Sequence, residues 1–561
     1  MKKIFFKFTV LTVAGMLLLV GCSLGREEQP IQESRAEQAS ARQDISEQGT
    51  SEPGTFERGT FEMGTSEQET FEPETSVQES VERESSGQVT MKQDTSEKLE
   101  TAGDGVPTIK ITPERKEWYS DDGEELLYYE EAGRVEVIGE GFDALGAALA
   151  GQWKGLGDAV PGDLEWIKEY YEDPDHYYTG FSATEFPDIC RLDNHVISLN
   201  DYFGDYLGGS HGTHGSIGRT YDVRSGKELQ LEDILTDSQG FYHKAAEYII
   251  ARLGEGIYKN DLYQNYAETV RTDTFGEMPA SWYLDSEGIV ITYQLYQSAP
   301  YVAGTPSVTL QYDEFAAYIK EDYRIPCDSL VADIEENEDI SGLIGETGEV
   351  MLVVQYNGYG YPVDVSVVSG NASEAVGSFK STVWWPYVIK RTDGRSFLIF
   401  SCDYALEDFV TYVYEVTGGA VRFCDKLDSV RRGDNICIGT DRIGLFMHLD
   451  VLGTYEGAMV YQMTDDGKLV QAEEIFAIYD SPCLTVIKDL SVTIDGAAAT
   501  ISAGTKIRIA GTDNAGKAYF QVAADNGETG VIEYVRDDGQ CQLLIGGVPE
   551  DEYFEKIPYE R

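Results

Sequence analysis

The chain has 561 residues and a formal net charge of −56 at pH 7, from 99 acidic and 43 basic residues. This length predicts two or three folded domains rather than one. So strong a negative charge argues against nucleic acid and anionic lipid surfaces as partners, because both would be repelled.

The first segment, residues 1–22, has the features of a secretory signal. Three lysines precede an apolar run that reaches Val20. The run ends in Leu-Val-Gly-Cys, which resembles a bacterial lipoprotein cleavage box. Cleavage there would make Cys22 the lipidated first residue and hold the protein on the extracytoplasmic face of the cell membrane. An uncleaved anchor is the alternative, and no other segment is apolar for the ~20 residues that a spanning helix needs.

Residues 23–105 are polar, acidic and poor in large aliphatic side chains. A five-residue repeat begins at Gly49, Gly54, Gly59 and Gly64, and a period of five fits neither a helix nor a strand face. This composition predicts a disordered tether, with a root-mean-square reach of roughly 50 Å. Phenylalanine recurs in the repeat, so a docking motif is the alternative.

Residues 106–325 have the pattern of an α+β region, which we divide into a smaller α/β unit (106–180) and a main domain (181–325). In the smaller unit we expect strands at Trp118–Tyr119, Leu126–Tyr129 and Arg134–Ile138, and helices at Phe142–Trp153 and Leu164–Tyr171.

The main domain is expected to begin with a strand over Asp188–Leu199, followed by a glycine-rich loop that carries His211 and His214. A second strand leaves this loop and turns at Ser225–Gly226, a pair typical of hairpins. A further short strand over Glu228–Leu231 precedes the helices.

A helix is predicted over Phe241–Leu253, because apolar residues recur there at helical spacing and Gly254 ends the pattern. The other elements expected are strands at Trp282–Leu284, Gly288–Tyr296 and Ser307–Leu310, and a short helix at Asp313–Lys320. Separate hairpins and helices are typical of the α+β class.

Two motifs in this domain resemble a known family. The first is the loop Gly-Gly-Ser-His-Gly from Gly208, followed by a Tyr-Asp-x3-Gly-Lys-x-Leu-x-Leu-x-Asp-Ile-Leu run that ends at Leu235. The second is Pro-Tyr-x-Ala-Gly from Pro300. Both are similar to the extracellular family called domain of unknown function 3298 (DUF3298), which includes the ectodomain of the anti-sigma factor RsiV and the accessory domain of the peptidoglycan deacetylase PdaC. The resemblance covers about Lys116 to Lys320.

This resemblance implies an extracellular ligand-binding domain. The deacetylase relatives carry catalysis in a separate domain with a His-x3-His zinc motif, and none of the six histidines here has that spacing. The anti-sigma relatives need a cytoplasmic segment and a membrane span, which a lipoprotein does not have. Neither activity is therefore implied, and what carries over is an ectodomain that in RsiV recognises lysozyme, a strongly basic protein.

Helical signals fade after about Asp328, and residues 326–482 are predicted to be all-β. Eight short strands are expected, at Val350–Gln355, Val363–Val368, Tyr387–Arg391, Ser396–Ser401, Phe409–Glu415, Ala420–Cys424, Ile443–Leu449 and Ala458–Met463. Their spacing suits a sandwich, a small barrel or propeller-like blades alike. Residues 483–561 resemble bacterial SH3-like barrels of the cell-wall type, although the pattern fits any small β barrel. The predicted fold is therefore an α+β region followed by an all-β half.

Seven cysteines follow Cys22. Their odd number and wide spacing show neither a metal-binding pair nor a compact disulfide framework. One disulfide, Cys402–Cys424, is expected because both residues end nearby predicted strands.

His211 and His214 are the main candidates for chemistry. Zinc needs three or four ligands, and this pair supplies two at best, so Asp205, Asp222 or His195 would have to add a third through folding. We expect no metal and no cofactor. The loop glycines instead suggest a tight turn held by a His211 hydrogen bond to the backbone, or a loop that binds a partner.

A Ser-His-Asp triad can be drawn from Ser210, His211 and Asp205, but no Gly-x-Ser-x-Gly elbow surrounds any serine. No residue is therefore predicted to be catalytic. Aromatic residues cluster at 356–361 and at Trp384–Trp385, and sugars or peptides stack on such rings. The alternative is that these rings belong to the core.

Together these observations favour a non-enzymatic, lipid-anchored, monomeric cell-envelope protein that binds cell-wall glycopeptide or a wall-active protein such as lysozyme. The residues expected to contact the ligand are Gly208, Gly209, His211, His214, Tyr296 and Tyr301. Two alternatives stay open: a zinc- or histidine-dependent hydrolase that acts on the cell wall, and a structural envelope protein without a small ligand.

Overall fold

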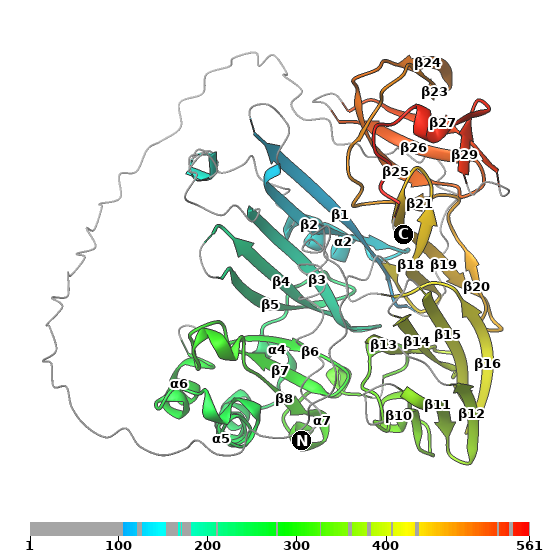
Figure 1. Ribbon diagram of the computed structural model, residues 1–561. Coiled ribbons are helices and arrows are strands. Elements are labelled where there is room, and N and C mark those ends of the chain that lie inside the picture. Colours follow the sequence, from blue (N-terminus) through cyan, green and yellow to red (C-terminus); the bar gives the residue numbers. More distant parts are fainter. Residues whose placement is uncertain are drawn as a thin grey trace, which may run out of the picture. The chain divides into compact units, whose positions relative to one another are not determined.

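The computed structural model (Figure 1) describes most of the chain after residue 104. The described ranges are 105–120, 126–152, 166–168, 170, 181–208, 211–276, 279–325, 327–356, 362–377, 383–404, 408–431, 437–523, 527–537 and 542–559. The predicted signal, Cys22 and the predicted tether up to residue 104 lie outside the described residues. All described residues belong to one compact unit, Ser86–Arg561.

Five strands form the first part of the largest sheet. They are β1 (Thr108–Tyr119), β2 (Leu126–Ile138), β3 (Phe181–Asp193), β4 (Val196–Tyr206) and β5 (Thr213–Asp222). Neighbours in this series pair antiparallel, except β2 and β3, which are parallel. The predicted helix forms as α2 (Asp143–Gln152) and buries Leu145 and Leu149 in the same cluster as Ile109 and Ile111 of β1.

The prediction of one strand over Asp188–Leu199 is wrong, because the chain reverses inside it. Asp193 ends β3, and its Oδ1 accepts hydrogen bonds from the backbone N–H groups of His195 and Val196, each at 2.7 Å. An aspartate that binds the backbone two or three residues ahead makes a turn without glycine or proline. The apolar residues on either side of it therefore belong to two paired strands, β3 and β4.

Most of the described helices lie between β5 and β9 in the chain (Figure 1). They are α4 (Leu231–Ile234), α5 (Ser238–Glu255), η1 (Ile257–Asn260), α6 (Tyr266–Asp273), η2 (Tyr301–Ala303), α7 (Tyr312–Phe315) and η3 (Glu321–Tyr323). The side chain of Asp237 starts α5 by accepting a hydrogen bond from the Gly240 N–H at 3.0 Å. The predicted apolar stripe is confirmed, since four of its residues are buried and the fifth, Ile250, packs half-buried against the same cluster. The buried four are Ala245, Ala246, Ile249 and Leu253.

A separate three-stranded antiparallel sheet packs against α5. Its strands are β6 (Ser281–Leu284), β7 (Gly288–Thr292) and β8 (Ser307–Gln311). β7 is shorter than predicted because the chain turns after it, with Tyr296 at a φ of +64° that no strand contains. The predicted helix at Asp313–Lys320 makes only one turn, because Ile319 leaves it to form a bridge with Leu235. The predicted strand at Glu228–Leu231 is a single bridge between Tyr221 and Glu228.

From β9 onward, the elements of the described chain are strands, apart from two short helices of one turn each. These are α8 (Ser341–Ile344) and η4 (Glu550–Glu552). The strands before residue 482 are β9 (Leu330–Asp333), β10 (Val350–Tyr356), β11 (Pro362–Ser369), β12 (Ala372–Gly377), β13 (Val383–Lys390), β14 (Ser396–Tyr404), β15 (Asp408–Thr417), β16 (Ala420–Leu427), β17 (Cys437–Ile438), β18 (Arg442–Asp450), β19 (Thr454–Met463), β20 (Leu469–Gln471) and β21 (Phe476–Ala477). All eight strands expected in this region are present, and the predicted α+β region followed by an all-β half is confirmed.

Hydrogen bonds between strands join segments that are far apart in sequence. β9 pairs with β3 on one side and with β13 on the other. β1 pairs with β17, where Ile109 stands opposite Ile438. The sheet thus connects segments that the sequence pattern assigns to separate domains, and the domain boundaries themselves stay predictions.

The last strands surround their own core. They are β22 (Leu484–Thr485), β23 (Leu490–Ile494), β24 (Ala497–Ile501), β25 (Lys506–Thr512), β26 (Lys517–Val522), β27 (Thr529–Glu533), β28 (Val535–Asp537), β29 (Gln542–Ile545) and β30 (Val548–Pro549). Five of them follow one another through hydrogen bonds in the order β24, β23, β27, β26, β25. Their core includes Ile507, Phe520 and Ile532. The likeness to an SH3 barrel stays a prediction.

The predicted disulfide Cys402–Cys424 is wrong. Cys424 is a free thiol, and its Sγ lies 3.4 Å from the carbonyl oxygen of Arg422. Cys402 of β14 and Cys424 of β16 are buried in different clusters, so they face opposite sides of the same sheet. Among the described residues, no helix is both long enough and apolar enough to cross a membrane.

Candidate functional site

The two candidate histidines lie where the β4–β5 hairpin closes. His214 belongs to β5 and stands opposite Gly204 of β4, and His211 lies in the connecting loop. Asp205 holds the end of this loop, because its Oδ1 accepts a hydrogen bond from the Thr213 N–H at 3.0 Å. The hairpin therefore fixes His214 through strand pairing and His211 through a short loop.

Glycine at position 208 is required by the geometry of this loop. Its φ is +91°, a value that favours glycine, and an added Cβ would lie 3.1 Å from the Phe181 ring. Gly209 and Ser210 lie outside the described residues. The Ser210–His211–Asp205 triad therefore stays a sequence-based possibility.

The second candidate segment, residues 293–306, is folded by hydrogen bonds to its own residues. The Gln294 N–H donates to the side-chain oxygen of Gln297 at 3.0 Å, and the Gln297 N–H donates to the Gln294 carbonyl at 3.1 Å. Tyr296 lies between them, with its side chain 56% exposed and its φ at +64°. A tyrosine held in a left-handed conformation is uncommon and often marks a functional position.

The Pro-Tyr-x-Ala-Gly motif makes the next turn of this segment. Tyr301 begins η2 directly after Pro300, and the Gly304 N–H donates to the Tyr301 carbonyl at 2.9 Å. Gly304 has a φ of +67°, which lets the chain leave the turn at once. The motif thus presents the Tyr301 ring at a fixed place.

Gln294 of this segment and two residues of β6 make close contacts with the edge of β5. The Gln294 side-chain amide donates to the Ser216 carbonyl at 2.6 Å, and the Gly218 N–H donates to Ser281 Oγ at 2.5 Å. A Cβ at Gly218 would lie 2.0 Å from the Trp282 carbonyl oxygen, so this glycine allows β6 to approach β5. These contacts give hydrogen-bond partners to backbone groups that would stay unpaired on an edge strand.

The docked segment brings the two histidines and two tyrosines together with a third tyrosine. We call this set the aromatic–histidine patch: Tyr202, His211, His214, Tyr296 and Tyr301. The ring centroids of His211 and Tyr301 are 3.9 Å apart with an interplanar angle of 23°, which is a stacked pair. His214 meets the edge of Tyr301 at 5.5 Å and stacks with Tyr202 at 6.4 Å, while Tyr296 lies 6.2 Å from Tyr301.

The electrostatics of the patch favour a neutral His214. Burial lowers the pKa of His214, and the neighbouring His211 lowers it further by charge repulsion. Burial raises the pKa of Tyr202, and Tyr301 adds to this effect. His211 is exposed, and its Nδ1 lies 3.1 Å from the Gly212 carbonyl oxygen, which is the backbone contact expected for this histidine.

Of the three suggested third metal ligands, two lie away from the histidines and the third is bound to the loop backbone. Asp222 ends β5 eight residues beyond His214, at roughly 25 Å along a strand. His195 lies in the β3–β4 turn, and Asp205 is used by the loop. No group of three or more metal-binding side chains suited to an ion occurs among the residues that the structure describes.

Sequence reasoning missed Tyr202, although the pattern held a signal for it. Tyr202 and Gly204 are two residues apart in β4, so they lie on the same face of the strand. Strand pairing puts His214 opposite Gly204, which brings it close to Tyr202 on that face.

The sequence also suggested a binding surface of aromatic residues at 356–361 and Trp384–Trp385. Residues 357–361 lie outside the described residues. Trp385 packs against the cluster that contains Phe409 and Phe446. The core interpretation therefore suits Trp385 best.

Comparisons with known proteins identify one family in this part of the chain. Residues 232–313 match the family described as "Protein of unknown function (DUF3298)". Two solved structures of this family are similar to the chain. One, from Bacteroides fragilis, is 14% identical and covers 39% of this chain and 95% of its own, with a TM-score of 0.29. The other, from Pseudomonas aeruginosa, is 17% identical with the same coverages and a TM-score of 0.28.

No curated protein matches the chain. The predicted resemblance to DUF3298 is confirmed over residues 232–313, a shorter range than the predicted one from Lys116 to Lys320. The matched residues run from α4 into α7 and include Tyr296 and Tyr301, whereas His211 and His214 precede them.

Proposed function

We propose that this protein is a non-enzymatic, lipid-anchored envelope protein that binds cell-wall glycopeptide through the aromatic–histidine patch. The observation that carries the proposal is the stack of His211 on Tyr301 at 3.9 Å beside the exposed Tyr296. These rings are fixed by two separate segments of the chain and lie partly open to solvent.

Such a surface suits a ligand that combines apolar faces with hydroxyl and amide groups. Tyrosine and histidine rings offer flat faces for stacking, and their polar edges accept or donate hydrogen bonds. The left-handed backbone of Tyr296 is held by the Gln294–Gln297 turn, so the direction in which its side chain leaves the chain is fixed before a ligand arrives. An ordered surface loses less entropy on binding than a flexible one.

The proposed location rests on the sequence. Cys22 would carry the lipid, and the segment up to residue 104 would act as a tether that lets the described part reach the wall. If residues 483–561 form an SH3-like barrel, they supply a second contact with wall material.

Cosedimentation with purified cell-wall sacculi tests the proposal. We expect saturable binding of the purified chain that persists at high salt. Tyr296→Ala and His211→Ala should each weaken it about five- to tenfold, because each removes a ring worth about 1 kcal/mol of stacking. His243→Ala is the matched control, since His243 is an exposed histidine on α5 outside the patch.

Each other outcome contradicts the proposal in its own way. Binding that both variants leave unchanged would move the ligand site elsewhere. Turnover of wall material that His211→Ala abolishes would favour the hydrolase. A complex with lysozyme but not with sacculi would favour a protein ligand, and the absence of any saturable ligand would favour the structural alternative.

A further inference from the structure

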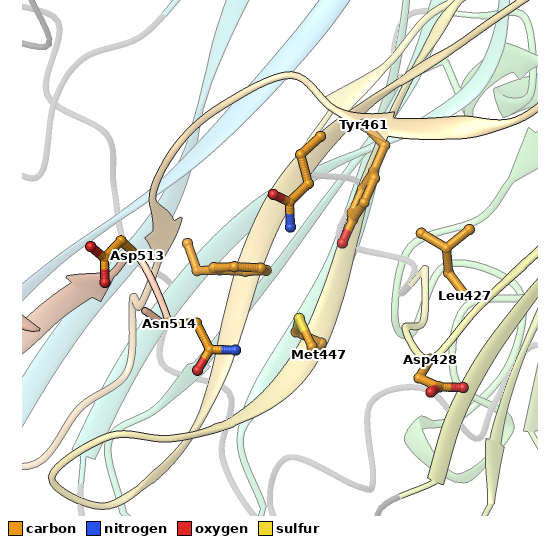
Figure 2. A pocket seen from close by; sticks show the side chains of 8 residues that line it. Leu427, Asp428, Met447, Tyr461, Asp513 and Asn514 are labelled. Atoms are coloured by element: carbon orange, nitrogen blue, oxygen red, sulfur yellow. The ribbon is translucent and has the colours of Figure 1, made fainter. Parts of the chain in front are cut away.

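A separate cavity of about 310 Å³ lies among the strands of the all-β half (Figure 2). Its lining side chains come from β16, β18, β19, β20, β21 and the turn between β25 and β26. They are Leu427, Asp428, Met447, Tyr461, Gln471, Phe476, Asp513 and Asn514. A cavity of this size is at the lower end of the range for small-molecule sites, so it suits one amino-acid side chain or a similar group.

Strand pairing fixes the turn that closes one side of this cavity. Phe476 of β21 pairs with Thr512 of β25, and the Ile478 N–H donates to the Ala510 carbonyl at 3.0 Å. Directly after Thr512, the Oδ1 of Asp513 accepts hydrogen bonds from the next backbone N–H groups at 2.8 to 2.9 Å. Asn514 is thereby held at a φ of +51°.

The polar groups of the lining have fixed directions. Asn514 Oδ1 accepts a hydrogen bond from Arg536 at 3.1 Å, so its amide nitrogen is left to face the cavity. Figure 2 shows this nitrogen on the side of Met447 and shows the Tyr461 hydroxyl pointing into the same space. The lining therefore combines a thioether, two aromatic rings and polar edges.

The charges of the lining are all of one sign. Its carboxylates belong to Asp428 and Asp513, and no basic side chain is part of it. Burial acts to raise the pKa of Asp513, but the backbone N–H groups that it binds and the nearby Lys517 together lower it. This carboxylate is therefore already compensated by the hydrogen bonds of its own turn. Asp428 is exposed at the rim, and it remains the group that can attract a cation.

We infer that this cavity binds a lysine-type side chain, a primary ammonium on an apolar stem, carried by a peptide. The stem would lie along Leu427, Met447 and Phe476, and the ammonium would meet Asp428 at the rim. Carboxylates and aromatic faces both attract ammonium groups. The site is distinct from the aromatic–histidine patch, and the inference stands whether or not that patch binds the wall.

A ligand-observed NMR titration of the full chain with N-acetyl-lysine N-methylamide tests this inference. We expect saturable binding that weakens with salt and falls about three- to tenfold for the norleucine analogue, which lacks only the ammonium. Asp428→Asn should cause a similar loss, and because Asp428 is exposed this variant keeps its fold. Glu474→Gln, a nearby exposed acid outside the lining, is the control.

The inference is overturned if no saturation is reached, if the norleucine analogue binds equally well, or if Asp428→Asn and Glu474→Gln have the same effect. Preferential binding of N-acetylglucosamine would also overturn it in favour of a sugar site. The last part of the titration compares two peptides. One is a cell-wall stem peptide that contains a diamino acid, and the other is an unrelated peptide that contains lysine. Tighter binding of the stem peptide would assign the lysine-type group to the wall, and equal binding to peptides in general.

Discussion

A buried carboxylate, Asp193, links the fold of the hairpins to the DUF3298 region. Its Oδ1 makes the turn between β3 and β4, while its Oδ2 accepts hydrogen bonds from Arg191 Nε at 2.7 Å and lies 2.6 Å from Arg191 Nη2. Arg191 is fully buried and also donates to the Tyr312 hydroxyl at 2.6 Å and to the Tyr323 carbonyl at 2.8 Å. One ion pair thus ties β3 to α7 and η3.

Replacing Asp193 by asparagine should therefore destabilise the protein strongly. The variant keeps an oxygen for the turn but leaves the Arg191 guanidinium buried without its counter-charge. Removal of one partner from a buried pair costs about 3–5 kcal/mol. Chemical denaturation followed by circular dichroism measures the loss, and Asp237→Ala, which removes only a helix cap, should cost about 1 kcal/mol. Equal losses in the two variants would contradict the argument.

At the scale of single residues, the sequence predicted the candidate site only in part. His211 and Tyr301 are 90 positions apart, and no local pattern indicates that their rings stack. Both residues were predicted to contact a ligand because the two motifs that contain them resemble one family. Tyr202 was missed because its role depends on the strand register between β4 and β5.

At the scale of elements, local patterns predicted the strands well and the turns less well. The alternating strands of the all-β half, and turns such as Gly418–Gly419 with positive φ at both residues, carry their own signals. The turn after Asp193 carries no glycine or proline. Its conformation comes from a side-chain hydrogen bond, which the sequence does not reveal.

The β6–β7 turn should make the stability of the protein depend on pH. Glu287 in this turn has its pKa raised to about 7, first by burial, then by a hydrogen bond with Glu338 and by the charges of Asp285, Glu338 and Glu335. The Ser286 hydroxyl donates to the Asp333 carbonyl at 2.9 Å, so the turn is packed against the end of β9. The folded chain therefore holds the Glu287 proton more tightly than the unfolded chain does.

Stability should accordingly fall as the pH rises from about 4.5, the ordinary carboxyl value, through about 7. Above that range the ionised Glu287 costs about 1–3 kcal/mol, and Glu287→Gln should remove this loss. Thermal unfolding across this range would show a flatter curve for Glu287→Gln than for the wild type. Glu255→Gln, an exposed acid at the end of α5, should follow the wild type. Parallel curves for all three proteins would contradict the assigned pKa.

At the scale of the whole molecule, the sequence could not predict which segments pair. β1 bonds to β17, and β9 joins β3 to β13. Periodicity reports which face of a strand is buried, but it carries no information about a partner more than 300 residues away. The fold class was therefore predictable, whereas the continuity of the largest sheet was not.

The same limit applies to the contact between β1 and the last strands. Arg508 of β25 donates to Glu117 and, at 2.7 Å, to the Tyr119 hydroxyl, while its Nη1 donates to the Ser481 carbonyl at 2.8 Å. Burial, followed by the hydrogen bond to Glu117, raises the pKa of Tyr119 to about 12, so the phenol stays neutral. One guanidinium thus joins the end of β1 to the last strands.

Arg508→Ala should loosen the last strands from β1. It removes the hydrogen bond from Arg508 to the partly buried Glu117, which keeps Arg115 as a cationic partner, at 2.9 Å. The loss of hydrogen bonds to a charged group costs about 1.5–3 kcal/mol. Hydrogen exchange should then rise in β1 and β25 together. Arg271→Ala is the control, because Arg271 and Glu247 are each about half exposed, at 51% and 54%, and such pairs contribute little. Faster exchange in β1 alone would mean that the last strands keep their stability without this contact, whereas unchanged exchange in both would remove Arg508 from the interface.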